Sequence, residues 1–278
     1  MNRFLALEVC LEISCAMGDM RIFACLLLTV FCVVSRVPAA SIVIVTVEDP
    51  DNYESPRTMR DFSQKQLAPL GHRVSLVLGD TPQKHHFEGL TKALEHADLL
   101  VLFSRRRFPP LDQMAAIRAH LDAGKPLVGI RTAHHAFAPK PGEQVDPSLA
   151  PWPVFAQEVL GCQNAGYETR GLPYRVALAQ ERPDPAHASL LAGVDPFKIF
   201  GHQSLYKVLP LAEDARPLLT GIPGEGSGAL PQPIAWTRLH GKKKARIFYT
   251  SLGAPQDMEL PDVLKLLQNA VSWALMRD

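Results

Sequence analysis

Apolar runs alternate with amphipathic stretches in the chain after residue 40. Ser41–Val47 and His72–Leu78 are short apolar runs rich in β-branched residues, which predicts two buried strands. Between them, Thr58–Leu67 places its apolar residues at helical spacing. Because a strand, a helix and a strand follow one another, we expect the two strands to pair in parallel.

The same alternation continues to residue 130. Leu90–His96 and Leu111–Asp122 have the spacing of helices, and Asp98–Phe103 and Lys125–Ile130 read as buried strands. Right-handed crossovers then predict an α/β fold with a doubly wound, mostly parallel sheet between two helical layers, a three-layer sandwich.

The second half is less regular. Ala138–Pro153 carries five prolines and predicts a long loop, and the glycines of Gly221–Gly228 predict a hairpin loop. The remaining elements that we expect are a helix over Val154–Leu160, strands over Tyr174–Leu178, Arg216–Leu219, Pro233–Arg238 and Ala245–Ser251, and a closing helix over Pro261–Met276.

The N-terminal region has the pattern of an export signal. Met20 and an arginine precede an apolar run, Ile22–Val34, and small residues end it at Ala40. This run is shorter than the roughly 20 residues that cross a bilayer. We predict a signal peptide over residues 20–40, a mature N-terminus at Ala40 or Ser41, a periplasmic or extracellular location, and no stable membrane insertion after cleavage. Residues 1–19 are expected to be a non-native extension. The alternative to the signal peptide is an amphipathic N-terminal helix.

Composition narrows the class of protein. The chain has 278 residues and is 47% hydrophobic, so we expect one domain over residues 41–278. The net charge of +1 shows no basic excess, so we expect no nucleic-acid partner. The oligomeric state stays open. Cys162 is the single cysteine after the signal, which excludes an internal disulfide in the mature chain. We expect Cys162 to pack behind a helix end; the alternative is a reactive thiol.

Polar residues gather where three of the predicted strands end. The carboxyl ends of parallel strands meet at one edge of a sheet, where ligands bind. The residues that follow these strands are Glu48, Asp49, Arg105, Arg106, Arg107, Arg131, Thr132, His134 and His135. The sequence therefore predicts a polar binding pocket at this edge.

Chemical roles follow from the side chains. Arg131 can donate two hydrogen bonds to a carbonyl or carboxylate group, and His135 or His134 can carry a proton near neutral pH. Glu48 can orient that imidazole or act as the base. The catalytic candidates are thus His135, Glu48 and Arg131. Two structural alternatives remain: the arginine run as a solvated turn, and His134 as a surface residue.

Other chemistries lack support in the sequence. The adjacent histidines have none of the spacings typical of metal ligands, so we expect neither a metal nor another cofactor. No serine lies in a Gly-x-Ser-x-Gly turn. His202 is the one remote histidine that can return to the site.

Several strings together resemble the ThuA-like, or trehalose-utilisation, family over nearly all of residues 41–278. They read SRRRFPPLDQ, GKPLVGIRTAHHAF, EVLGC, SLYKVLPL, PIAWTRLHGKKKARIFYTSLG and QNAVSWAL. The resemblance implies the class I glutamine amidotransferase-like (flavodoxin-like) fold and an association with oxidised sugars. Arg131 stands where the amidotransferases have their catalytic cysteine, which excludes a glutaminase. The carbohydrate-binding candidates are Arg105, Arg106, Arg131, Thr132 and His134, with Ser204 and Tyr206 of the SLYK string.

The chain also departs from the family pattern. Ala254 and Gln203–Ser204 replace a histidine and an acidic residue that are frequent in the family, and His134 replaces a serine. GCQNAGY lacks a histidine that often follows the preceding turn. We expect an exported protein that acts on or binds a carbohydrate and, if it is an enzyme, is a lyase or hydrolase of an oxidised (keto) glycoside. The alternative is a non-catalytic sugar-binding or accessory protein, which the missing family histidines favour.

Overall fold

The computed structural model describes residues 39–180 and 184–276. The expected extension over residues 1–19 and nearly all of the expected signal peptide lie outside the described residues. Within the described ranges, no helix is long and apolar enough to span a membrane.

Five parallel strands form one half of the main sheet. In spatial order they are β2 (Arg73–Gly79), β1 (Ser41–Val47), β3 (Leu99–Phe103), β4 (Leu127–Ile130) and β11 (Ala245–Thr250). All residues of β3 and β4 are buried, because helices cover both faces of this half. The order is that of a flavodoxin-like sheet, so the predicted α/β fold is confirmed.

The second half of the sheet is antiparallel. It continues from β11 through β10 (Gln232–His240), β9 (Arg216–Pro223), β6 (Tyr174–Leu178) and β7 (Phe200–Gly201). Short connections join β9 to β10 and β10 to β11, and such connections allow only antiparallel neighbours. The nine-stranded sheet is therefore mixed, and the predicted hairpin loop near Gly221–Gly228 lies between β9 and β10.

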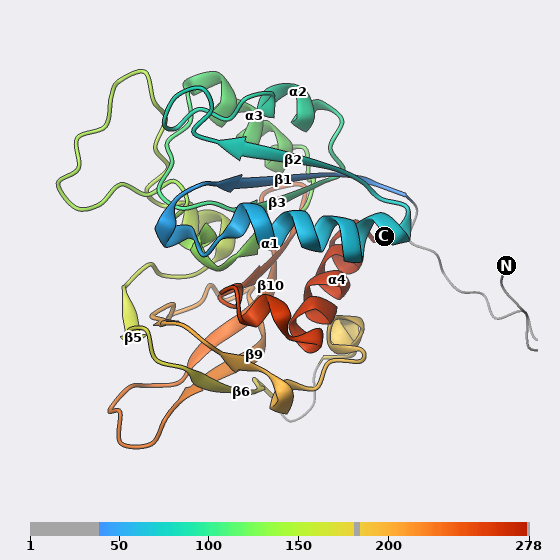
Figure 1. Cartoon of the computed structure of the whole chain (residues 1–278), viewed down its shortest axis with the longest axis vertical. Coiled ribbons are helices and arrows are strands. Elements are labelled where there is room, and N and C mark those ends of the chain that lie inside the picture. Colours follow the sequence, from blue (N-terminus) through green and yellow to red (C-terminus); the bar gives the residue numbers. More distant parts are fainter. Residues whose placement is uncertain (1–38, 181–183, 277–278) are drawn as a thin grey trace, which may run out of the picture. The chain divides into compact units, whose positions relative to one another are not determined.

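Helices cover the two faces of the parallel half. α1 (Ser55–Phe62), which continues as a π-helical turn to Leu67, lies with α4 (Pro261–Leu275) on one face, as Figure 1 shows. α2 (Leu90–Glu95) and α3 (Leu111–Asp122) cover the other face and pack on a second apolar core. The three-layer arrangement follows from these two cores.

Some elements differ from the predicted ones. The expected helix over Val154–Leu160 is a π-helical turn over Ala156–Leu160, and a separate two-stranded sheet joins β5 (Tyr167–Thr169) and β8 (Leu205–Tyr206). β5, β7 and β8 span only two or three residues, too few to show an apolar period. Ala138–Pro153 contains no helix or strand, as expected.

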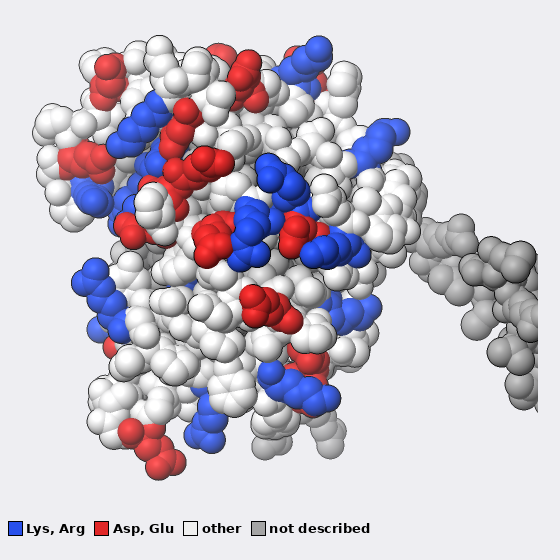
Figure 2. All heavy atoms as spheres, in the orientation of Figure 1, with Lys and Arg blue, Asp and Glu red and all other residues white. Residues whose placement is uncertain are grey.

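Charged side chains are mixed on the face in view. Figure 2 shows acidic and basic groups interspersed over α1, where Arg57 pairs with Glu54 and Lys65 pairs with Asp61. These exposed pairs contribute little to stability. This face of the molecule has no uniform charge.

Candidate functional site

The carboxyl ends of the central strands meet at one edge. Thr46 lies opposite Phe103 in the β1–β3 pair, and Leu102 lies opposite Gly129 in the β3–β4 pair. The buried side chain of Asn52 joins the loops that follow, because its amide nitrogen donates to the carbonyl oxygen of Phe103 (2.9 Å) and its amide oxygen accepts from Thr132 (2.6 Å). The prediction that these three loops converge is confirmed.

A sharp turn follows β4, with Arg131 at its apex. Arg131 has a φ of 45° and begins a short 3-10 helix, Arg131–His135. A Cβ added to Gly129 would lie 3.2 Å from the Tyr249 ring and 3.3 Å from the Cβ of Ala133, so the turn needs small residues on both sides. The hydroxyl of Tyr249 donates to the carbonyl oxygen of Arg131 (2.7 Å) and holds this strained conformation.

The Arg131 side chain is fully buried. Its guanidinium lies over the rings of Tyr53, at 4.1 Å, and Tyr206, at 5.1 Å, and its Nη1 donates to the carbonyl oxygen of Ser251 (2.6 Å). Arg131 was expected to reach a ligand directly. The structure instead leaves it 0% exposed and without a place in the pocket wall.

A pocket of about 310 Å³ opens in front of these two tyrosines. Its wall comes from the loops after β1, β3 and β4 and from the small β5–β8 sheet with its flanking residues. The lining residues are Pro50, Asp51, Tyr53, Arg105, Thr132, His135, Tyr167, Arg170, Gly171, Gln203, Ser204 and Tyr206.

Five of the predicted site residues therefore share one pocket: Arg105, Thr132, His135, Ser204 and Tyr206. Glu48 does not join them, because its exposed side chain lines a separate surface depression with Arg57 and Arg60. The prediction that Glu48 supports His135 is wrong in this structure, because the Glu48 side chain is exposed and does not line the pocket that contains His135.

The three arginines after β3 have different surroundings. Arg105 pairs with Asp51 (2.9 Å) and Asp49 (3.5 Å), and Arg107 pairs with Asp80 (2.7 Å) and Asp49 (3.1 Å). Burial would raise the pKa of Asp49, but the backbone N–H of Asp51 and both arginines outweigh it and hold that pKa below its ordinary value.

Arg106 does not line the pocket. Its Nη1 donates to the carbonyl oxygen of Ala138 (2.7 Å), so it fastens the long loop rather than facing a ligand. Arg107 is only 6% exposed and is likewise structural. Of the arginine run, only Arg105 lines the pocket, and the run is not a solvated turn.

Both histidines of the turn are buried. Burial lowers the pKa of His134 to about 3 and that of His135 well below its ordinary value, so both imidazoles are neutral at pH 7. Nδ1 of His134 lies 3.1 Å from the carbonyl oxygen of Arg131 and, because a carbonyl only accepts, carries the proton. His134 packs against Tyr206 at 4.3 Å, so the alternative of a surface residue is wrong.

His135 lies at the pocket wall and contacts His134. Its Nδ1 is 3.1 Å from Nδ1 of His134, with the two rings nearly perpendicular. No carboxylate of the described residues makes a hydrogen bond to His135. His202 stays outside the pocket, where its Nδ1 lies 2.9 Å from Asp257, although the adjacent Gln203 lines the wall.

Sequence reasoning missed several pocket residues. Tyr53, Tyr167, Arg170 and Gln203 belong to loops or short strands without an apolar period, and only the fold brings them to the site. Tyr53 follows β1 in the EDPDNY string, so its aromatic ring among strand-end residues was the available signal. Cys162, by contrast, is 1% exposed behind a helical turn, as expected, and burial raises its thiol pKa, which contradicts the reactive alternative.

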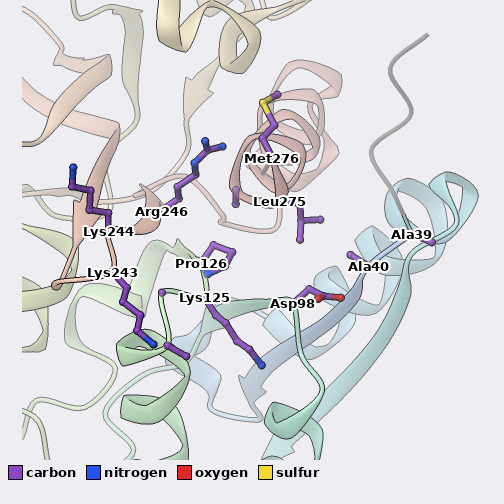
Figure 3. A pocket seen from close by; sticks show the side chains of 13 residues that line it. Ala39, Ala40, Asp98, Lys125, Pro126, Lys243, Lys244, Arg246, Leu275 and Met276 are labelled. Carbon is purple, nitrogen blue, oxygen red and sulfur yellow. The ribbon is translucent and has the colours of Figure 1, made fainter. Parts of the chain in front are cut away.

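A second pocket, also of about 310 Å³, lies at the opposite, amino edge of the sheet. Figure 3 shows its basic side chains spread around the cavity rather than directed at one point; they are Lys125, Lys243, Lys244 and Arg246. Arg246 donates to the carbonyl oxygen of Trp273 (2.9 Å). This pocket contains none of the predicted site residues. Within residues 39–180 and 184–276, no group of three acidic, histidine or cysteine side chains is placed to hold a metal ion.

One family model matches most of the chain, and two solved structures share its fold. The family described as ThuA, trehalose utilisation, matches residues 61–274. A ThuA-like protein from Bacteroides uniformis is 13% identical over 87% of this chain and 94% of its own, with a TM-score of 0.60. A ThuA-like protein from Parabacteroides merdae is 17% identical over 86% of this chain and 90% of its own, with a TM-score of 0.55. No curated protein matches the chain.

Proposed function

Because this chain belongs to the ThuA (trehalose utilisation) family, we propose that its strand-end pocket binds a carbohydrate and acts on it as a lyase or hydrolase of an oxidised, keto glycoside. The observation that carries the proposal is the position of His135, a neutral imidazole in the wall of a pocket that also contains tyrosine, arginine and hydroxyl side chains. We also propose that the protein is exported.

The pocket wall suits a sugar. A sugar ring offers C–H groups on its faces and hydroxyls around its edge. Tyr53, Tyr167 and Tyr206 supply aromatic surface for the C–H groups, and Arg105 and Ser204 supply polar contacts for the hydroxyls. The volume of about 310 Å³ is at the lower end of the range for small-molecule sites and fits one or two sugar rings.

A keto group gives His135 a defined task. The keto group acidifies the neighbouring C–H, and the neutral imidazole removes that proton. The electron pair forms an enolate, whose oxygen Arg105 can stabilise. The enolate then re-forms the ketone and expels the glycosidic oxygen on the next carbon, which takes the proton from His135. Elimination leaves an unsaturated ketone, and addition of water to it completes a hydrolysis.

A binding-only protein is the second candidate. One observation favours it: no carboxylate of the described residues hydrogen-bonds to His135, and Glu48 lies outside the pocket. An imidazole without an acidic partner is a weaker base, because nothing stabilises its protonated form. In that case the pocket retains its ligand contacts and lacks turnover.

Calorimetry and product analysis with trehalose and 3-ketotrehalose test the two candidates. In the His135→Ala variant, binding should stay within about twofold of wild type while turnover falls at least about a hundredfold. His96→Ala removes an exposed histidine at the C-terminal end of α2 and is the control, in which both binding and turnover should stay at the wild-type level. Turnover by wild type that survives in His135→Ala would reject the catalytic assignment.

Arg105 tests the pocket independently of catalysis. Arg105→Ala should lower the affinity for the same sugar about tenfold to a hundredfold, because it removes a charge-assisted contact. Arg60→Ala, an exposed arginine on α1, is the matched control. Binding without turnover would establish the accessory function, and binding of neither sugar would reject the carbohydrate assignment.

A further inference from the structure

One edge of the buried Arg131 guanidinium makes no hydrogen bond to the described residues. Its Nε and Nη2 are buried and have no hydrogen-bond partner among the described residues. The hydroxyls of Tyr174 on β6 and Ser251 after β11 are buried and unpartnered as well. Four orphaned donors thus belong to three neighbouring side chains, and an unsatisfied buried donor is costly enough that each needs an explanation.

These groups lie close together. Nη1 of Arg131 donates to the backbone carbonyl of Ser251 (2.6 Å), which places that residue beside the guanidinium. The Tyr174 hydroxyl is near enough to Arg131 and to the Ser251 hydroxyl for both to lower its pKa, but it has no partner that meets the geometry of a hydrogen bond. The four groups are therefore neighbours where β4 and β11 end and β6 begins.

No anionic side chain neutralises Arg131. The part of the chain that the structure describes contains no ion pair to it. Burial raises the pKa of Tyr174 to about 12 and shifts the pKa values of Tyr206 and Tyr249 upward too, so these phenols are neutral. The nearby carboxylate of Asp257 attracts Arg131, but its oxygens already accept from His202 and from the backbone N–H groups of residues 253 and 254.

We propose that Arg131, Tyr174 and Ser251 bind a small inorganic anion of the halide class, such as chloride. Tyr53 and Tyr206 cover the faces of the guanidinium, so an acceptor can approach only along its edge, where Nε and Nη2 form a fork. A halide accepts all four hydrogen bonds and offsets the buried charge. A water molecule must also donate two hydrogen bonds and leaves the charge uncompensated.

The site is separate from the carbohydrate pocket. Arg131, Tyr174 and Ser251 do not line that pocket, and each of the three is at most 2% exposed. The anion joins β4 and β11 of the parallel half to β6 of the antiparallel half. It therefore stabilises the fold behind the pocket, whatever the pocket binds.

Thermal unfolding in sodium chloride and in sodium gluconate of equal ionic strength tests the site. We expect the Tm of wild type to be about 3 to 5 °C higher at a chloride concentration tenfold above Kd. Tyr174→Phe and Ser251→Ala each remove one donor and should reduce this difference. The control is Thr237→Val, which removes a buried unpartnered hydroxyl on β10. Its Tm difference between the two salts should equal that of wild type. Equal Tm values in both salts, or a full chloride effect in both donor variants, would overturn the proposal.

Diffraction from crystals of the wild-type protein grown in sodium bromide gives a readout that does not depend on any variant. An anomalous bromide peak within hydrogen-bond distance of Nε and Nη2 of Arg131 is the expected result. An ordered water at that point, with no anomalous signal, would show that the donors hold solvent and would refute the anion site.

Discussion

At the scale of single residues, burial decides the chemistry of the histidines. His134, His135 and His120 would each ionise near neutral pH in water, but in the fold each is nearly inaccessible and stays neutral. For His135 this leaves a lone pair ready to accept a proton at the pocket wall. For His120 on α3 it makes folding sensitive to acid.

Replacement of His120 by glutamine should reduce the loss of stability in acid. Burial lowers the pKa of His120 to about 4, although its hydrogen bond to the carbonyl oxygen of Pro126 opposes the shift. The unfolded chain protonates His120 at a higher pH than the folded chain does. The free energy of unfolding therefore has its full value above about pH 6.5 and decreases as the pH falls toward 4. The free energy of unfolding, measured with urea, should decrease between pH 7.5 and pH 5. This decrease should be smaller by about 1 to 2 kcal/mol in His120→Gln than in wild type.

The control for this experiment is His96→Gln, which makes the same replacement at an exposed histidine. Equal acid sensitivity of wild type and His120→Gln would contradict the assigned shift.

At the scale of elements, the turn after β4 sets the geometry of the site. Gly129 and Ala133 let the chain bend sharply enough to place Arg131 behind the pocket and His135 in its wall. Asn52 then ties this turn to the ends of β1 and β3. The site depends on these connections more than on any one helix.

Gly129→Ala should destabilise the protein by about 1 to 3 kcal/mol, because the new methyl group presses on the Tyr249 ring and on Ala133 in a packed core. It should also lower affinity for a pocket ligand, since Tyr249 holds the turn through the carbonyl oxygen of Arg131. Gly224→Ala, where an added Cβ meets nothing within 4 Å, is the matched control. Chemical unfolding curves that coincide for the two variants would show that the turn tolerates a side chain.

At the scale of the whole molecule, the main sheet and the small β5–β8 sheet together build one pocket. The parallel half of the main sheet supplies Arg105 and His135 at strand ends, as such sheets usually do. The small sheet and its flanking residues add Tyr167, Ser204 and Tyr206 across the opening. A ligand would therefore touch both sheets, which predicts that binding stabilises the domain as a unit.

Export is a prediction for the whole chain. Since Ile22–Val34 is an apolar run ended by small residues, we expect the protein recovered from its native host to begin at Ala40 or Ser41. Intact-mass measurement and N-terminal sequencing of the recovered protein identify its first residue. A cytoplasmic chain that retains residues 20–38 would be incompatible with export.

The sequence alone determined the elements whose pattern is long enough to read. Strand Ser41–Val47, strand Tyr174–Leu178 and helix Leu111–Asp122 have the predicted bounds, because apolar period and length are local properties. The convergence of the loops after β1, β3 and β4 also followed from the sequence, since parallel strands with right-handed crossovers leave few alternatives.

Only the tertiary structure decided which side chains share the pocket and in what state. It directed Glu48 outward and enclosed Arg131 between Tyr53 and Tyr206. It also brought in Tyr167 and Arg170 from a segment with no readable period. Burial and contact depend on residues that are far apart in the chain, such as Arg131 and Ser251. A pattern of neighbouring residues does not show which remote residues come into contact. The physical reason is that secondary structure reflects neighbours along the chain, whereas a site reflects neighbours in space.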